Sequence, residues 1–474
     1  IVNAFAEFFS RNFDDSKVNN INRLVTDLPH TTIHLPHISE AEVLNAAKKI
    51  KTNWVSGHDN IPAFLVSDCA SALAYPLMLL FNLILKTCIF PEIWKLSIIT
   101  PIFKKGKRSV IENYRPISLI CNFAKVFELV LHRFLLFNIR NKISESQHGF
   151  VYGRSTTSNL CTFTQFVSDS FDKRLQVDVA YMDFSKAFDK LNHKILLVKL
   201  NNIGFSVALL ELIKSYLANR LQIVKYLGHV SKTSVVSSGV PQGSVLGPLF
   251  FVIYINDLLQ AIQSNILLYA DDVKIYRGTA KYEDCLLLQT DLLYFLQWSK
   301  LNMLPINFDK CHIMSYTNKN SQISYDYTLN EAVLSRVDYF SDLGVTFDPK
   351  LTFRAHINNI CANALKSLGF ILRCGSNFND LECLRILYFS YVRSRLEYAS
   401  IVWSPFCQNH TDALEKIQRR FLKYLAYRVD GTYPIRGTPQ ISLLNRFQLT
   451  DLNTRRISYS LNFLRNLMCS QVDC

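Results

Sequence analysis

The stretch LLYADDVKIY, residues 267–276, places two adjacent carboxylates, Asp271 and Asp272, inside an otherwise apolar run. Its aliphatic and aromatic flanks predict two short strands joined by a turn. Because Asp favours tight turns, an Asp-Asp turn on the surface would need no function. The apolar flanks instead favour a partly buried hairpin, where paired carboxylates are unfavourable unless protonated, hydrogen-bonded or neutralised by a cation. Oxygen ligands of this kind suit Mg²⁺ or Mn²⁺, so further ligands are expected elsewhere in the chain.

Another predicted strand, earlier in the sequence, ends in a carboxylate. In residues 176–200, apolar side chains alternate up to Asp183, and the period then becomes helical. Asp183 is therefore expected at the carboxyl end of a strand, where α/β architectures place ligands. Asp189, six residues later, is expected to face outward from the following helix or to cap it.

A glycine-rich stretch, SSGVPQGSVLGPLFFVIYINDL (residues 237–258), lies between these two carboxylate sites in the sequence. Its glycines around Gln242 would allow a ligand to approach the backbone closely. On its own the stretch is simply a loop before a predicted apolar core helix. Its position between the two carboxylate stretches is what makes it a candidate part of the same site.

The charge balance indicates the class of partner. Lys and Arg number 52 against 38 Asp and Glu, which gives a formal charge of +14 and a pI of about 9.1. This excess favours a polyanionic partner, nucleic acid before a membrane surface, over a basic protein without one. A helix predicted over residues 412–427 has a basic side that either contacts phosphate or is only solvated. Its apolar stripe is Leu414, Ile417, Phe421 and Leu425, and its basic side is Lys416, Arg419, Arg420 and Lys423.

The cysteines, the longest apolar run and the first residue bear on the cellular compartment of the chain and on whether it is a piece of a longer one. The 12 cysteines have no metal-binding spacing and no secretory signal is present, so free thiols in a reducing compartment are expected. The longest apolar run, residues 74–90, contains Pro76, Asn82 and Lys86 and is expected to be a core helix, not a membrane span. The chain begins at Ile1, as a piece of a longer reading frame would.

Taken together, the motifs occur in the order typical of one family. The chain resembles the reverse transcriptases of non-LTR, LINE-type (jockey-like) retrotransposons over most of its length. The motifs are GHDNIP (57–62), PIFKKGKR (101–108), NYRPISL (113–119), QHGFVYGRST (147–156), GVPQGSVLGPLF (239–250), YADD (269–272), WSKLNMLPINFDKC (298–311) and YFSDLGVTFD (339–348).

The resemblance implies an α+β, right-hand polymerase that copies RNA into DNA from a primer 3′ hydroxyl. Residues 1–38 would be an N-terminal extension or linker, and residues 39–176 fingers with basic nucleotide-binding loops. Residues 177–350 would be the palm, an antiparallel sheet plus helices with the catalytic motifs. Residues 351–474 would be a helical thumb and C-terminal region.

The resemblance also assigns the catalytic carboxylates. Asp183 and Asp271 would be the bridging ligands of two Mg²⁺ ions, with Mn²⁺ as a possible substitute. Adjacent strand residues point to opposite faces, so a turn must intervene if Asp272 is to approach the ions, and Asp272 is given a secondary role. Without metal, three clustered carboxylates repel, and at least one pKa should be raised.

Other positions would bind substrate. Phe188, five residues after Asp183, occupies the steric-gate position beneath the incoming sugar, or is a core Phe of the motif helix. Gln242 and Gly243 would lie beside the templating pair. Arg115 and a lysine of the basic run, Lys104 or Lys105, would neutralise the triphosphate, although that run is also compatible with a nuclear-localisation signal or a solvated loop. Lys310 would lie near the leaving pyrophosphate, and residues 339–345 resemble the primer-grip hairpin.

Some positions depart from the family pattern. Asn60 and the pair Asn330–Glu331 stand in turns where Gly would be expected. No upstream endonuclease domain is visible, and Cys469 and Cys474 lack a following His that would form a Cys/His knuckle.

The expected partners are an RNA template, a DNA primer or target DNA, and dNTPs, without a membrane. The resemblance places the chain inside the cell, in cytoplasm and nucleus, without a clear targeting signal, and no oligomeric state follows from the sequence. Two other functions stay open. One is a noncatalytic nucleic-acid-binding remnant or domesticated reverse transcriptase, and the other is an unrelated Mg²⁺-dependent phosphohydrolase.

Overall fold

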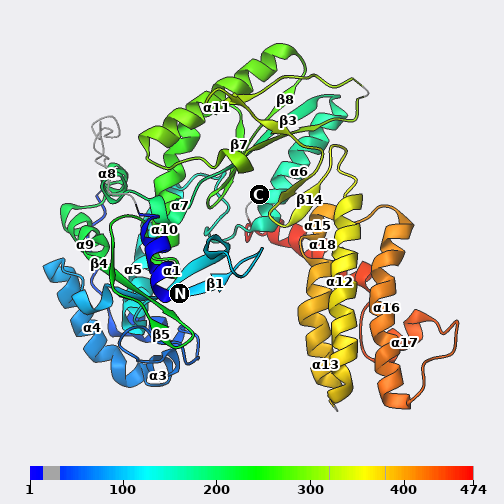
Figure 1. Ribbon diagram of the computed structural model, residues 1–474, viewed down its shortest axis with the longest axis horizontal. Helices are drawn as coiled ribbons and strands as arrows, with labels where there is room; N and C mark the ends of the chain where they lie inside the picture. Colours follow the sequence, from blue (N-terminus) through cyan, green and yellow to red (C-terminus); the bar gives the residue numbers. More distant parts are fainter. Residues whose placement is uncertain (14–31, 320, 379, 473–474) are drawn as a thin grey trace.

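The computed structural model describes residues 1–13, 32–319, 321–378 and 380–472. Its mixture of helices and mixed sheets confirms the predicted α+β class. Figure 1 shows a lower-left part around β1 and β4, an upper part around β3, β7 and β8, and a helical part at the right that begins with α12. We call these parts the fingers, the palm and the thumb.

The palm is a five-stranded sheet in the order β12-β9-β3-β8-β7. Its neighbours are antiparallel, except for the parallel pair β12 and β9. On the central strand β3, Ala180 and Met182 pack into one core with α10 and α11, whereas Val179 and Tyr181 pack into a second core with α6 and the thumb. Both faces of β3 are therefore covered. The palm strands are β3 (Gln176–Asp183), β7 (Asn265–Tyr269), β8 (Asp272–Thr279), β9 (His312–Tyr316) and β12 (Ser335–Arg336), and the helices are α6 (Thr156–Asp172), α7 (Ala187–Lys190), α8 (His193–Ile203), α9 (Val207–Leu217), α10 (Leu246–Ile255) and α11 (Tyr282–Leu301).

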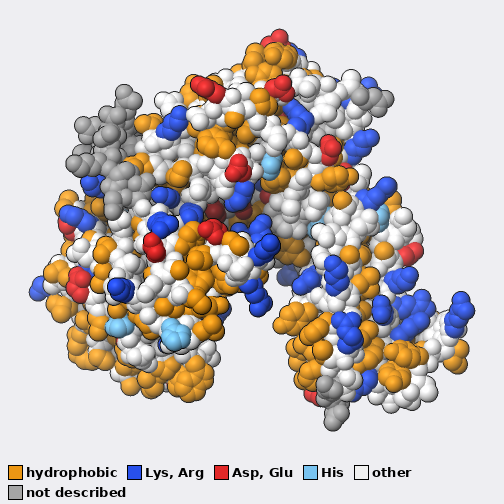
Figure 2. Space-filling model, viewed as in Figure 1, with side chains coloured by type: hydrophobic (Ala, Val, Ile, Leu, Met, Phe, Trp, Pro, Cys, Tyr) orange, Lys and Arg blue, Asp and Glu red, His pale blue; other side chains and the backbone are white. Residues whose placement is uncertain are grey.

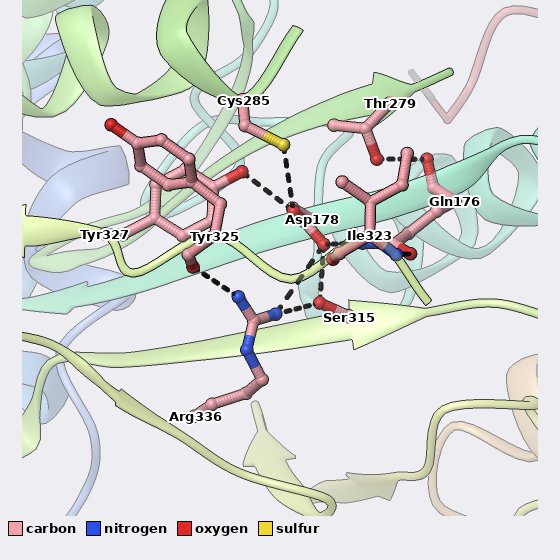
Figure 3. A network of polar contacts seen from close by, with 9 residues as sticks. All are labelled: Gln176, Asp178, Thr279, Cys285, Ser315, Ile323, Tyr325, Tyr327 and Arg336. Carbon is pink, nitrogen blue, oxygen red and sulfur yellow. Dashed lines mark hydrogen bonds and ion pairs between the residues drawn. The ribbon is translucent and has the colours of Figure 1, made fainter. Parts of the chain in front are cut away.

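A buried carboxylate, Asp178, anchors β3 away from its carboxyl end. Asp178 is fully buried and accepts hydrogen bonds from Gln176 Nε2 at 2.8 Å, Tyr327 OH at 2.7 Å and Ser315 Oγ. The Arg336 guanidinium lies 3.8 Å away (Figure 3). Because these partners come from β3, β9, β12 and the segment before β12, the network fixes the edge of the sheet, and its charge is structural.

The fingers contain a second five-stranded sheet, in the order β2-β1-β4-β5 with β6 paired to β4. The N-terminal helix α1 packs on this sheet, with Phe5 and Phe9 in a small core that includes Ile99 and Val224. The sheet crosses the predicted boundary at residue 177, because β4 pairs in parallel with β1. The elements are α1 (Val2–Ser10), α2 (Glu40–Lys48), α3 (Ala63–Asp68), α4 (Ala70–Thr87), β1 (Leu96–Phe103), β2 (Tyr114–Leu119), α5 (Asn122–Ile139), β4 (Arg220–Tyr226), β5 (His229–Val230) and β6 (Ser234–Val236).

The thumb is a group of helices in which α12, α13 and α16 lie side by side (Figure 1). The predicted apolar stripe of α16 is buried, and Lys416 and Arg420 are exposed on its other side. Arg419 instead donates to Thr438 O at 2.8 Å, so one of the four predicted basic side chains serves the fold. The helices are α12 (Arg354–Cys374), α13 (Leu381–Tyr388), α14 (Ser394–Glu397), α15 (Ser400–Trp403), α16 (Gln408–Asp430), α17 (Gln440–Arg446) and α18 (Leu452–Met468).

Two turns have another residue where glycine is expected, Asn60 in one and Glu331 in the other. Asn60 has φ of 57°, and Asn330 and Glu331 have φ of 52° and 66° between β10 (Thr328–Leu329) and β11 (Ala332–Val333). These angles are those of a two-residue hairpin turn with both central residues left-handed. Asn tolerates this backbone region and Glu adopts it less readily, so at both places the residue differs from the family pattern and the turn is kept.

Helix α4 differs from the expected core helix. Leu77 and Phe81 pack into the core, but Tyr75, Leu79 and Leu83 on the opposite side are 57%, 52% and 55% exposed. Within the described ranges, it is the one helix that by length and composition could cross a membrane. The 11 cysteines that the structure describes are free thiols, as predicted, and Cys474 lies outside the described residues.

Candidate active site

A two-residue turn between β7 and β8 carries Ala270 and Asp271. Tyr269 pairs with Asp272 across the hairpin, and Ala270 has a left-handed φ of 56°. The turn takes Asp271 out of the regular strand. An intervening turn was the predicted condition for Asp272 to approach the ions, because adjacent strand residues point to opposite faces. Asp272 lies directly opposite Asp183 on β3, so both side chains leave the same face of the sheet. The three carboxylates therefore meet at one end of the palm sheet.

A cavity of about 230 Å³ opens beside these carboxylates. Its wall includes Asp183, Asp272, Lys310 and residues 340–343 of the predicted primer-grip hairpin. Figure 2 shows the molecule hollowed between the fingers and the thumb, with Lys and Arg side chains along the hollow and acidic side chains recessed within it. Asp183, Asp272 and the hairpin thus share one cavity.

The pKa values of Asp271 and Asp272 lie above their ordinary range. At Asp271 the main cause is desolvation by the surrounding protein, and repulsion from Asp183 adds to it. At Asp272 desolvation and repulsion from Asp271, Asp342 and Asp183 raise the pKa to about 6, although this side chain is exposed at the cavity rim. The prediction of at least one raised pKa is confirmed, with desolvation as a larger cause than repulsion.

Asp272→Asn is expected to stabilise the metal-free chain at pH 7. Because folding raises the pKa of Asp272 from 3.8 to about 6, the folded state binds more protons, and the free energy of unfolding falls as pH rises from about 4 to about 6. The asparagine variant escapes this loss. Thermal unfolding in EDTA should give a higher Tm than wild type at pH 7 and nearly the same Tm at pH 4. A higher wild-type Tm at pH 7 would contradict the raised pKa.

Lys310 is paired with the carboxyl end of β3. Its Nζ donates to Asp183 Oδ2 at 2.6 Å, while the Lys310 side chain is 58% exposed. The preceding segment runs beside the end of β3, because Asn307 N donates to Asp183 O at 2.8 Å and Ser185 N to Pro305 O at 2.8 Å. The structure therefore brings the predicted Lys310 to the carboxylates.

The fingers hairpin of β1 and β2 supplies more cations. Desolvation lowers the pKa of Lys104, and repulsion from Arg115, Lys310 and Lys105 adds to this, whereas Asp183 acts in the opposite direction. Arg115, Lys104 and Lys105 are all exposed. These fingers cations and Lys310 therefore form one positively charged group near Asp183, and Arg and Lys are the side chains that suit phosphate oxygens.

Phe188 lies on the short helix α7 and is half-buried. Its ring stacks on Phe251 of α10 with centroids 4.6 Å apart, and Phe150 contacts it edge-on at 6.2 Å. One side of the ring thus belongs to the core, as one interpretation predicted. The side chain is nevertheless only half-buried, so its predicted steric-gate role stays a prediction.

The outward-facing prediction for Asp189 is wrong. Asp189 is 8% exposed and accepts hydrogen bonds from Gln242 Nε2 at 2.8 Å and Asn12 Nδ2 at 3.4 Å. Desolvation raises its pKa, and the two hydrogen bonds oppose this rise. Asp189 therefore orients the amide of Gln242, a role that its short distance from Asp183 in sequence did not reveal.

Gly243 also differs from its expected use. A Cβ there would lie 2.5 Å from Ser118 O, and φ is 135°. Ser118 N donates to Gln242 O at 2.8 Å, so β2 of the fingers approaches this glycine. The close approach that was predicted for a ligand is made instead by the backbone of β2. This contact joins the fingers to the palm beside Gln242.

Sequence reasoning gave no role to Gln147, which supports the catalytic turn. Gln147 is buried, and its Oε1 accepts from Ala270 N at 3.1 Å and Gly149 N at 2.8 Å. A Cβ at Gly149 would lie 2.3 Å from Ala270 N. The QHGF stretch was noticed only as part of the family order, although a buried amide beside a glycine is a signal for such close packing.

Comparison with known proteins agrees with this geometry. A family model described as reverse transcriptase (RNA-dependent DNA polymerase) matches residues 102–370, which are 269 of the 474 residues. The chain belongs to the reverse transcriptase family. The predicted resemblance to non-LTR retrotransposon enzymes is confirmed by the names of its relatives.

Two relatives illustrate the extent of the match. The RNA-directed DNA polymerase from mobile element jockey of Drosophila funebris is 30% identical over 403 residues, which are 81% of this chain and 43% of that protein. The probable RNA-directed DNA polymerase from transposon BS of Drosophila melanogaster is 28% identical over 434 residues, 88% of this chain and 47% of that protein. This reverse transcriptase chain therefore spans less than half the length of these relatives.

Reverse transcriptases use divalent metal ions, and the donor set here consists of carboxylate oxygens that suit such ions. Among the described residues, no three His, Cys, Asp or Glu side chains form a ready metal cage. Asp183 is held by Lys310 instead. Since Mg²⁺ is usually bound by one or two carboxylates together with substrate phosphates, these residues fit an ion that arrives with nucleotide.

Mg²⁺ is expected to raise the Tm of the wild-type chain. Each bound ion stabilises the folded state by mass action and relieves the repulsion among Asp183, Asp271 and Asp272. Thermal unfolding should be followed over a Mg²⁺ titration in wild type and in Asp183→Asn, which lacks one expected ligand. An equal rise in both proteins would show that these carboxylates are not the binding site.

Proposed function

We propose that the chain is an RNA-directed DNA polymerase of a non-LTR retrotransposon, which extends a primer 3′ hydroxyl with dNTPs. The observation that carries the proposal is that Asp183 and Asp272 line one cavity with Lys310, while Asp271 in the adjoining turn and Lys104 in the fingers interact electrostatically with Asp183. Carboxylates and cations converging in this way are typical of in-line phosphoryl transfer. The net charge of +14 supports a nucleic-acid substrate.

Each side chain has a role in this proposal. Asp183 and Asp271 would hold two Mg²⁺ ions, and Asp272 would assist them. When bound, the ions would supply activation of the primer hydroxyl and charge stabilisation on the transferred phosphoryl group. Mn²⁺ presents the same preference for oxygen ligands and could replace Mg²⁺.

The remaining residues would bind the nucleotide. Lys104, Lys105 and Arg115 neutralise the triphosphate, and Lys310 leaves Asp183 to meet the leaving pyrophosphate. Phe188 presents its ring to the sugar. Gln242, oriented by Asp189, contacts the templating pair beside Gly243.

The partners follow from the same chemistry. An RNA template would be copied onto a DNA primer or a nick in target DNA, which would place the chain in the cytoplasm and the nucleus. A noncatalytic nucleic-acid-binding remnant is the second candidate, because the net charge of +14 favours a polyanionic partner with or without turnover.

The deciding experiment is primer extension on poly(rA)/oligo(dT) with dTTP and Mg²⁺, together with a filter-binding titration of poly(rA) at several salt concentrations. Extension that requires both primer and template supports the polymerase. Binding with a steep salt dependence but no extension supports the remnant. Release of pyrophosphate or phosphate from dTTP without primer would support a phosphohydrolase instead.

A further inference from the structure

The hairpin of β13 (Phe340–Asp342) and β14 (Val345–Phe347) is a sheet of its own. Within the described residues, neither strand pairs with the palm sheet. Side chains hold the hairpin in place instead. The Phe340 ring stacks on Tyr181 of β3 with centroids 3.8 Å apart, and Tyr398 OH donates to Leu343 O at 2.8 Å from the thumb side.

A buried ion pair makes the third attachment. Lys274 of β8 pairs with Asp342 of β13, and their side chains are only 5% and 7% exposed. The Lys274 ammonium also lies 4.9 Å from the centre of the Phe163 ring, which is favourable for a cation. Lys274 is two residues beyond Asp272 and therefore points to the same face of the sheet.

The strand that carries a catalytic carboxylate is thus tied directly to the hairpin. Asp272, Lys274, Asp342 and Leu343 line one cavity with Asp183. A displacement of the hairpin by even 1 Å would move this wall relative to the carboxylates. In enzymes, errors of that size can reduce the rate roughly 100-fold.

The choice of an ion pair at this point is informative. A buried pair is weak evidence for stability, because apolar residues of similar volume often replace it without loss. Removal of one partner alone is severe, since it leaves a buried charge unpaired. A buried pair therefore specifies one arrangement of two elements more than it stabilises the fold.

We propose that Lys274 and Asp342 are positioning residues that seat the hairpin against β8 and thereby align the primer 3′ end with Asp183. The inference rests on the proposed polymerase function and adds a specific coupling to it. The pair is assigned no contact with nucleotide or metal in this role, although both of its members interact electrostatically with Asp272. Its effect passes through the hairpin to the primer strand.

The test is a double-mutant cycle with Lys274→Met, Asp342→Leu and the two combined. Either single change should reduce kcat for primer extension, by up to roughly 100-fold, and weaken binding of a primer–template duplex measured without nucleotide. KM for dTTP should stay near the wild-type value, because the nucleotide is held by the fingers. The double variant should recover most of both losses, since it buries no unpaired charge.

A matched control separates positioning from stability. Lys199, whose side chain is buried, pairs at 2.7 Å with the partly exposed Asp257, at a place outside the cavity. Lys199→Met should lower Tm as the single variants do, but leave primer binding unchanged in the folded protein. If Lys274→Met does not fold, Asp342→Asn carries the test, because it keeps the side-chain volume and loses the charge.

The possible outcomes point in different directions. Wild-type kinetics and duplex binding in the single variants, purely additive losses in the double variant, or an equal primer defect in Lys199→Met would each overturn the inference. If wild type extends no primer, the polymerase proposal fails. The binding measurements still decide the coupling, because weak duplex binding in the single variants and recovery in the double variant support it without turnover.

Discussion

The double variant Asp271→Asn, Asp272→Asn is expected to lose primer extension by a factor of at least about 1,000 on poly(rA)/oligo(dT). Asparagine keeps the shape of the turn but removes two negative charges near Asp183, that of Asp272 directly opposite it on β8 and that of Asp271 in the adjoining turn. Bound metal contributes several kcal/mol of transition-state stabilisation, and each 1.36 kcal/mol is about tenfold in rate. Single-nucleotide insertion with saturating dTTP and Mg²⁺ measures the effect.

Duplex binding by this double variant should persist, because fewer carboxylates near the phosphates reduce repulsion. Asp309→Asn is the matched control, since Asp309 is an exposed carboxylate one residue from Lys310. It should extend primers as wild type does. Substantial extension by the double variant would exclude these carboxylates as metal ligands.

Phe188→Val is expected to relax discrimination against ribonucleotides roughly 100-fold, which corresponds to about 2.7 kcal/mol. The ring is braced from behind by Phe251, so it cannot retreat from a 2′ hydroxyl above it. Valine would open that space while α7 and α10 remain in contact. The measurement is the ratio of kcat/KM for dTTP and UTP on the same primer–template.

Phe188→Tyr is the control for this experiment, because it keeps the ring and should keep the discrimination. Unchanged discrimination in Phe188→Val would assign Phe188 to the core alone. A fall in Tm without a change in sugar choice would lead to the same assignment.

Local patterns predicted the centre of the site well. The apolar flanks of YADD form β7 and β8, and Asp183 ends β3, because period-two alternation is visible in a few residues. The stripe of α16 was equally visible at three- and four-residue spacing. In these cases the determining residues lie next to one another in sequence.

Features that depend on distant partners were missed. Gln242 meets Asp189 across 53 positions, and Lys274 meets Asp342 across 68. Strand β4 joins β1 across more than 100 residues, so the fingers sheet draws on a segment predicted to be palm. One sequence contains no periodic signal for such pairings, because either member alone is an ordinary polar or apolar residue.

The ion pair between Lys310 and Asp183 gives the resting enzyme an internal counter-ion. Such a half-exposed pair is worth about 1 kcal/mol or less, so it is readily broken. In the proposed function, a metal ion at Asp183 would replace one cation by another, and the displaced ammonium would need a new anion. Nucleotide phosphates would provide one, so that loading of the metal and arrival of the nucleotide would be a single coupled event.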